Sequence, residues 1–217
     1  MKSSYLVTWV AAILVPVALI LTSVRILLTP AFVEIEYRTP NFPADPYGFI
    51  QEDRLHWAQL ARIYLLNDAD ISFLADMRFP DGSLVYNQRE LGHMVDVKNV
   101  VKATLVVWYI SLAILIGLGV WAVVGGWWDT YRLGLVRGGW LTVIFVGSVV
   151  LFVLVGFGVF FVYFHEVFFN PGTWIFEYSD TLIRLFPERF WRDAFLVIGG
   201  LSLFGGLALV FGYRGKI

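Results

Sequence analysis

The stretch NQRELGHMVDVKNVVK, from Asn87 to Lys102, joins a polar segment to a long apolar run. Asn87 is a favourable helix N-cap, and Glu90 stands three residues later, in the position of a capping box. The pattern therefore predicts a helix that begins here. On that helix Glu90, His93 and Asp96 follow one another at intervals of three residues, so they share one face.

Two interpretations of this face are open. A histidine flanked by carboxylates can be held in one tautomer and kept basic, which suits catalysis at a membrane surface. Alternatively, the stretch is a polar interfacial turn that caps a transmembrane helix.

The composition is that of an integral membrane protein. Hydrophobic residues make up 59% of the 217 residues and charged residues 15%, against roughly 25% charged residues in soluble domains. Cysteine is absent, which excludes disulfides, thiolate nucleophiles and thiolate metal sites. Because the chain has only three histidines, we expect no bound metal and no cofactor.

Four apolar runs have about the 20 residues that a bilayer-spanning helix needs. They cover roughly residues 5–24, 103–124, 140–164 and 194–213. Ser202 and Gly206, four residues apart in the last run, are small enough to let helices pack closely. Residues 125–139, which are rich in glycine, are expected to form a loop.

Two polar segments separate the runs, over about residues 30–102 and 165–193. The first contains a predicted amphipathic helix at Glu52–Leu66, a short helical turn at Asp70–Met77 and a turn at Pro80–Gly82. The second contains a predicted short helix at Thr181–Phe186. We predict an all-α fold, a four-transmembrane-helix bundle with a helical extracytoplasmic segment between spans 1 and 2 and a smaller one between spans 3 and 4. Residues 1–217 would form a single integral membrane domain.

The charge distribution predicts the orientation. One side of the predicted membrane carries the basic residues Lys2, Arg132, Arg137, Arg214 and Lys216. Asp129 is the only acidic residue on that side. By the positive-inside rule, both termini are cytoplasmic and the two polar segments face outward.

This topology places two histidines at the outer surface. His93 precedes an inward-running span, and His165 ends an outward-running one. The chain has no phosphate loop, no GxSxG elbow and no HExxH motif. Two histidines with carboxylates nearby and no enzyme nucleophile indicate general acid–base catalysis, in which the substrate supplies the nucleophile. Taken alone, His165 could equally be an interfacial aromatic residue.

Three runs carry a family resemblance: Glu90–Lys98, Phe164–Phe169 with Asn170 and Trp174, and Leu182–Glu188 with Phe190 and Trp191. With these runs, the chain resembles the bacterial four-span membrane proteins of the lipoprotein intramolecular transacylase (Lit) family. The resemblance covers the whole length in span order.

The resemblance implies a reaction. Enzymes of this family move the sn-2 acyl chain of a diacylglyceryl lipoprotein to the α-amine of its N-terminal cysteine, which gives a lyso-form lipoprotein. It implies a multi-pass protein of the bacterial cell membrane that meets lipoproteins and membrane lipids, and no nucleic acid. His93 would be the general base, oriented by Glu90 or Asp96. His165 would stabilise the oxyanion or protonate the leaving oxygen. These two roles could be exchanged, and Arg184 would help to position the substrate.

Two other classes stay open. A b-type haem protein could use His93 and His165 as axial ligands, because imidazole suits iron. A non-catalytic membrane scaffold could bind a partner through its outer segments. The oligomeric state is not determined by the sequence.

Overall fold

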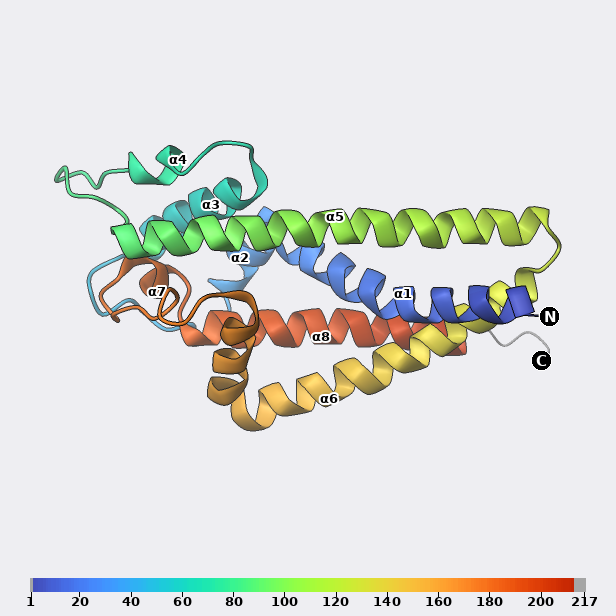
Figure 1. Cartoon of the computed structure of the whole chain (residues 1–217). Helices are drawn as coiled ribbons and strands as arrows, with labels where there is room; N and C mark the ends of the chain where they lie inside the picture. The colour runs from blue at the N-terminus through green and yellow to red at the C-terminus, as the bar shows by residue number, and fades with distance from the viewer. Residues whose placement is uncertain (1, 213–217) are drawn as a thin grey trace. The chain divides into compact units, whose positions relative to one another are not determined.

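The computed structural model describes residues 2–212, with side chains from residue 6 onward (Figure 1). The described chain is all-α, as predicted. Its helices are α1 (Lys2–Leu27), α2 (Pro30–Glu36), α3 (Gln51–Leu66), α4 (Ser72–Ala75), α5 (Gln88–Val124), α6 (Trp128–Phe168), α7 (Thr181–Leu185) and α8 (Glu188–Phe211). Four of these helices are long and apolar enough to cross a membrane: α1, α5, α6 and α8.

The four spans are confirmed in number and order, and the second and third belong to helices that are much longer than the predicted runs. The second predicted span, residues 103–124, is the C-terminal part of α5, because the helix that begins at Gln88 continues into the apolar run without a break. The third, predicted over residues 140–164, belongs to a helix that starts at Trp128 and ends at Phe168. The predicted end of the last span and two of the basic residues used to predict the orientation lie outside the described residues. These are Tyr213, Arg214 and Lys216.

The chain divides into two compact units. The first consists of Met1–Ile26, Thr104–Val155 and Phe195–Ile217. The second consists of Leu27–Ala103 and Gly156–Ala194. The helical geometry of α6 is interrupted at Gly156. This residue is also the first of the segment Gly156–Ala194, which belongs to the second unit. The single domain over residues 1–217 stays a prediction.

Most of the loop predicted over residues 125–139 is helical instead, because α6 begins at Trp128, and its glycines lie at close helix contacts. In the first unit, a Cβ atom on Gly134 would lie 2.8 Å from the carbonyl oxygen of Thr8. A Cβ atom on Gly138 would lie 2.5 Å from Cβ of Val15. These glycines are therefore contact points where α6 packs closely on α1, a common use of small residues between membrane helices.

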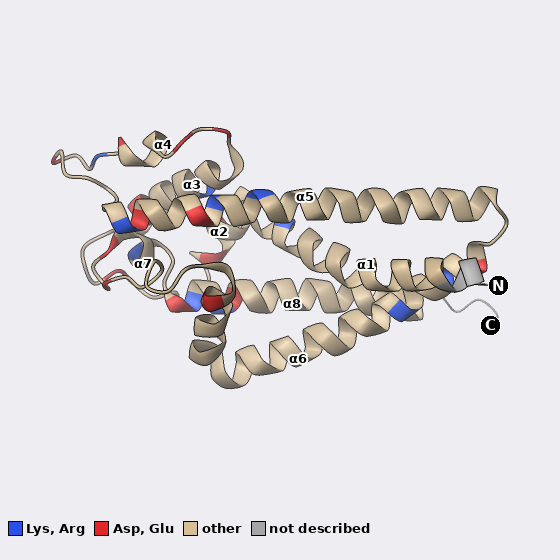
Figure 2. Ribbon diagram, in the orientation of Figure 1, with Lys and Arg blue, Asp and Glu red and all other residues tan. Residues whose placement is uncertain are grey.

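Small residues also bring α8 close to its neighbours in the first unit, as predicted. A Cβ atom on Gly206 would lie 3.0 Å from the carbonyl oxygen of Gly139. Ser202 Oγ lies 3.1 Å from Ser23 Oγ, so one hydroxyl donates to the other. Between Thr104 and Val155 the charged residues are only Asp129, Arg132 and Arg137, and the long helices are almost free of charge along this part of the chain (Figure 2).

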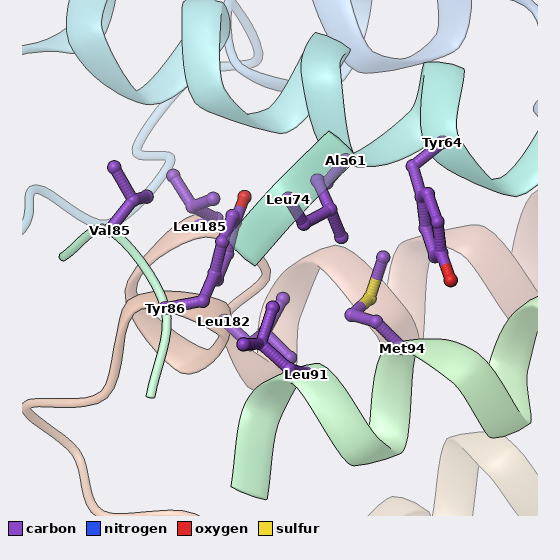
Figure 3. Close-up of a cluster of buried hydrophobic side chains, with 9 residues drawn as sticks. All are labelled: Ala61, Tyr64, Leu74, Val85, Tyr86, Leu91, Met94, Leu182 and Leu185. Atoms are coloured by element: carbon purple, nitrogen blue, oxygen red, sulfur yellow. The ribbon is translucent and has the colours of Figure 1, made fainter. Parts of the chain in front are cut away.

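The second unit has a hydrophobic core of its own. Figure 3 shows nine buried side chains that converge from four helices and one connecting segment. They are Ala61 and Tyr64 of α3, Leu74 of α4, Val85 and Tyr86 of the connection, Leu91 and Met94 of α5, and Leu182 and Leu185 of α7. Because the first turns of α5 and all of α7 share this core, packing fixes the helix that carries His93 against the second polar segment.

The short helices of the second unit agree with those predicted from the sequence, except that one further helix, α2, is present. Helices α3, α4 and α7 lie where the sequence predicts helical segments. The turn at residues 80–82 is present, with Gly82 at φ 86° and the Phe79 N–H donating to the Ser83 carbonyl oxygen at 2.9 Å. Helix α2 was not predicted. It begins with Pro30 at its first position, where the missing proline N–H has no partner to lose.

Candidate active site

Two histidines from distant parts of the sequence meet in the second unit. His93 lies in the second turn of α5, and His165 lies in the last turn of α6. Their ring centroids are 6.2 Å apart, and the ring planes differ by 24°. Both residues are buried, with 9% and 8% of their surface exposed. The predicted pair therefore shares one site.

Aromatic rings enclose the two imidazoles. Phe169 contacts both, with ring centroids 4.8 Å from His93 and 5.5 Å from His165. Phe176 lies 5.3 Å from His93, and Trp174 lies 4.8 Å from His165. Such surroundings exclude water, so the electrostatic interactions of a reacting group are stronger than in bulk solvent.

The tautomer of His165 is set by its own helix. Its Nδ1 atom lies 2.8 Å from the backbone carbonyl oxygen of Phe161, four residues earlier. A carbonyl oxygen can only accept, so Nδ1 carries the proton. In the neutral ring, Nε2 therefore holds the lone pair and is the basic atom. Sequence reasoning did not find this contact, although the four-residue spacing on a helix was available as a signal.

His93 has no such partner. Its Nδ1 atom is buried without a hydrogen bond among the described residues. The carboxylates expected to orient it do not do so, because neither Glu90 nor Asp96 makes a hydrogen bond to His93 in the part of the chain that the structure describes. Sharing a helix face brings side chains near one another, but it does not decide which polar groups pair.

Glu90 is occupied by backbone groups instead. One carboxylate oxygen accepts the N–H of Asn87 at 2.8 Å, and the other accepts the N–H of Leu182 at 2.7 Å. Asn87 Oδ1 in turn accepts the N–H groups of Arg89 and Glu90, each at 3.0 Å. The predicted capping box is therefore present, and its carboxylate also binds the start of α7.

Asp96 faces a different space. With Asn99 of α5 and with Glu166, Phe169 and Asn170 it lines a cavity of about 420 Å³. Phe169 therefore lines the polar cavity and also contacts both imidazoles. The lining is rich in carboxylate and carboxamide groups.

Arg184 is not joined to either histidine by any hydrogen bond or ring contact among the described residues. Its guanidinium forms an ion pair with Asp45 at 2.9 Å, and the Asp45 side chain is fully buried. Burial opposes the charge on Asp45, but hydrogen bonds from Arg184 and from the Phe49 N–H, together with the charges of Arg184 and Arg54, outweigh it and lower its pKa. Arg184 thus fixes the segment around Asp45 and lines a second cavity of about 410 Å³.

Within residues 2–212, no group of three or more His, Cys, Asp or Glu side chains is placed so that it could hold a metal ion. The chemical groups of the site are two imidazoles, the indole of Trp174 and aromatic walls. This set can move a proton and donate hydrogen bonds.

Comparison with known proteins agrees with the resemblance. Residues 9–191 match the family described as lipoprotein intramolecular transacylase Lit. The chain belongs to this family. Membership in the Lit family makes it an acyltransferase of lipoprotein modification, and its four apolar helices make it a multi-pass integral membrane protein.

A relative and two solved structures extend this result. The chain is 31% identical to a protein of Aquifex aeolicus (strain VF5) described as uncharacterized, over 97% of this chain and 95% of the relative. The in meso structure of Lit from Bacillus cereus covers 98% of this chain and 95% of its own, with a TM-score of 0.69 and 22% identity. A variant of that protein with one histidine replaced by arginine gives a TM-score of 0.67 at 19% identity, over 98% of this chain and 91% of the variant. At these identities the structural likeness establishes the Lit fold.

Proposed function

We propose that this protein moves the sn-2 acyl chain of a diacylglyceryl lipoprotein to the α-amine of the same molecule's N-terminal cysteine. The product is a lyso-form lipoprotein with an N-acyl group. One observation carries the proposal: two buried imidazoles lie 6.2 Å apart, centroid to centroid, in a water-poor site of a Lit family protein.

The chemistry needs a base and a donor. An α-amine with a pKa of about 8 is largely protonated at neutral pH and must lose a proton before it attacks an ester. The amine nitrogen then bonds to the ester carbonyl carbon, and the bond from that carbon to the sn-2 oxygen breaks. The proton that the ammonium loses before the attack goes to the medium. A second proton leaves the nitrogen as it becomes an amide, and it passes through the enzyme to the sn-2 oxygen. No water or second substrate is consumed.

The hydrogen bond from His165 Nδ1 to Phe161 supports the exchanged assignment of roles. With Nδ1 protonated, Nε2 of His165 takes the proton of the amine. His93, whose Nδ1 atom has no hydrogen-bond partner among the described residues, then donates to the oxyanion or to the leaving oxygen. Phe161 acts only through its backbone oxygen, which holds the His165 ring in the useful tautomer.

Proximity supplies much of the rate in this proposal. The amine and the ester belong to one molecule, so the site has only to hold them in a reactive geometry. Effective molarities for such reactions can be on the order of 10⁵ M or more. Exposed apolar side chains along α5 and α6 are expected to meet membrane lipids. The positive-inside rule supports an orientation with cytoplasmic termini and an active site that faces outside.

The test is to express the protein in a bacterial strain without its own N-acylating enzymes and to analyse a lipoprotein by mass spectrometry. Wild-type protein should give the lyso-form, and His93→Ala and His165→Ala should lower its formation by at least about 100-fold. His56→Ala is the matched control, because His56 is exposed and its ring contacts only Trp57 among the described aromatic residues.

Each result separates the alternatives. Full product from either site variant would remove that histidine from the mechanism. Absence of product from the wild-type protein would contradict the acyl transfer. A Soret band in the purified wild-type protein would support the haem alternative, and a phenotype that survives both substitutions would support the scaffold.

A further inference from the structure

Trp174 carries a buried polar atom that no described residue binds. Its indole Nε1 has no hydrogen-bond partner among the described residues, although the atom is buried. Buried tryptophan N–H groups usually have an acceptor. Trp108 is an example in this chain, since its N–H donates to Thr22 Oγ1 at 3.0 Å. The unused donor of Trp174 therefore needs an explanation.

A tight turn brings the Trp174 ring to His165. The turn follows directly after α6, which ends at Phe168. In it, the carbonyl oxygen of Asn170 accepts hydrogen bonds from the Thr173 N–H at 3.2 Å and from the Thr173 hydroxyl at 2.9 Å. Gly172 adopts a positive φ of 82° in this turn, which a glycine adopts without strain. The chain therefore reverses within a few residues, and the Trp174 ring packs on His165 with centroids 4.8 Å apart.

Two rings that neighbour His165, those of Trp174 and His93, therefore each carry a buried polar atom without a partner among the described residues. His93 Nδ1 is the other buried polar atom without a partner at this site, and its ring lies 6.2 Å from that of His165. An indole N–H is a donor only and does not change its protonation state. The group it fits is an oxygen atom on which negative charge develops beside His165.

We propose that Trp174 Nε1–H donates a hydrogen bond to the carbonyl oxygen of the sn-2 ester and to the oxyanion that forms when the amine attacks. This inference rests on the function proposed above. As the nitrogen–carbon bond forms, the carbonyl electron pair moves onto the oxygen. It returns when the bond to the sn-2 oxygen breaks. Trp174 neither gains nor loses a proton, and the proton of the amine follows the histidine route already described.

The substitution Trp174→Phe separates hydrogen bonding from packing. Phenylalanine keeps an aromatic face against His165 but lacks the donor. Removal of one oxyanion donor typically lowers kcat by roughly 100- to 1,000-fold, so kcat should fall by that factor while KM changes by less than about threefold. The assay uses purified full-length protein and a synthetic diacylglyceryl-cysteine peptide in detergent micelles. Trp191→Phe is the control, because Trp191 is 37% exposed and packs on Phe186 and Phe190.

A second replacement keeps the test decisive if the Trp174→Phe protein does not fold. Replacement of Trp174 by 3-benzothienylalanine keeps the bicyclic shape and puts sulfur in place of the N–H group. The same loss of kcat, at an unchanged melting temperature, supports the inference. Full kcat in a folded Trp174 variant would overturn the inference, and so would an equal loss of kcat in Trp191→Phe. In both cases an active wild-type protein would leave the proposed function intact. A wild-type protein without product would overturn both.

Discussion

Glu90 Oε1 accepts the backbone N–H of Leu182 at 2.7 Å, across 92 positions of the sequence. The carboxylate is 1% exposed, and its other oxygen accepts the N–H of Asn87. A buried carboxylate is stable only when such donors satisfy it. This one connects the start of α5, which carries His93, to the start of α7. The residue expected to orient a histidine therefore orients two backbone segments.

Replacement of Glu90 by glutamine should lower stability. The amide keeps the shape, but it has one acceptor oxygen for two backbone donors, so one buried N–H loses its partner. We expect a loss of about 1–3 kcal/mol, measured as a lower Tm in detergent. Glu177→Gln is the control, because Glu177 is exposed and its side chain makes none of the described hydrogen bonds. An unchanged Tm for Glu90→Gln would contradict the importance of this link.

The ion pair between Arg184 and Asp45 should be needed for folding. Arg184→Ala leaves a buried carboxylate without its partner, and breaking a buried pair in this way costs about 3–5 kcal/mol. Arg89→Ala should cost less than about 1 kcal/mol, because the Arg89 side chain is 45% exposed in its pair with Asp180. Thermal unfolding of the two variants gives the comparison. Equal effects would show that burial does not distinguish the pairs.

Asp45 should also make the stability of the folded protein depend on pH in the acid range. The pKa of Asp45 is lower in the folded protein than in the unfolded chain. Its stabilising contribution is therefore present above the unfolded pKa, about 3.9, and is lost as the pH falls through the folded value. In a series of unfolding measurements from pH 6 downward, wild-type protein should lose stability below about pH 4 more steeply than Asp45→Asn. Parallel curves would argue against this contribution.

Glu36 should change the stability with pH in the direction opposite to Asp45. Burial, and then the negative charge of Asp193, raise the pKa of Glu36 to about 7. A raised folded pKa means that the contribution to stability is complete below the unfolded value and is lost as the pH rises through about 7. Glu36→Gln should therefore raise Tm relative to wild type at pH 8, and the difference should shrink at pH 5. Glu34→Gln, on the same helix, is the control. A difference that does not depend on pH would exclude this titration.

Two glycines should respond in opposite ways to alanine. Gly92 lies inside α5, and a Cβ atom there would meet nothing within 4 Å. Gly92→Ala should stabilise the protein by about 0.5–1 kcal/mol, because alanine loses less backbone entropy in a helix. Gly134→Ala should destabilise it by about 1–3 kcal/mol, because the new atom would overlap the Thr8 carbonyl oxygen. Measured Tm values with the same sign would show that local packing does not decide the outcome.

Much of the second unit was predictable from local pattern. Helix α3, the turn at Gly82 and helix α7 follow from periodicity and turn residues, which act over a few residues. Helix α2 was not found, because its seven residues include two acids and too few apolar positions to show a period. The capping box at Asn87 was found, since it too depends only on neighbours along the chain.

The sequence by itself determined four membrane-crossing helices and the family, and it predicted that His93 and His165 lie at one membrane surface. Apolar length and topology are enough for these, because each is set along the chain. Only the tertiary structure decided that Glu90 binds Leu182, that Phe161 fixes the His165 tautomer, and that Gly134 and Gly138 form helix contacts. Hydrogen bonds and close packing depend on ångström distances between atoms, and spacing in a sequence does not contain those distances.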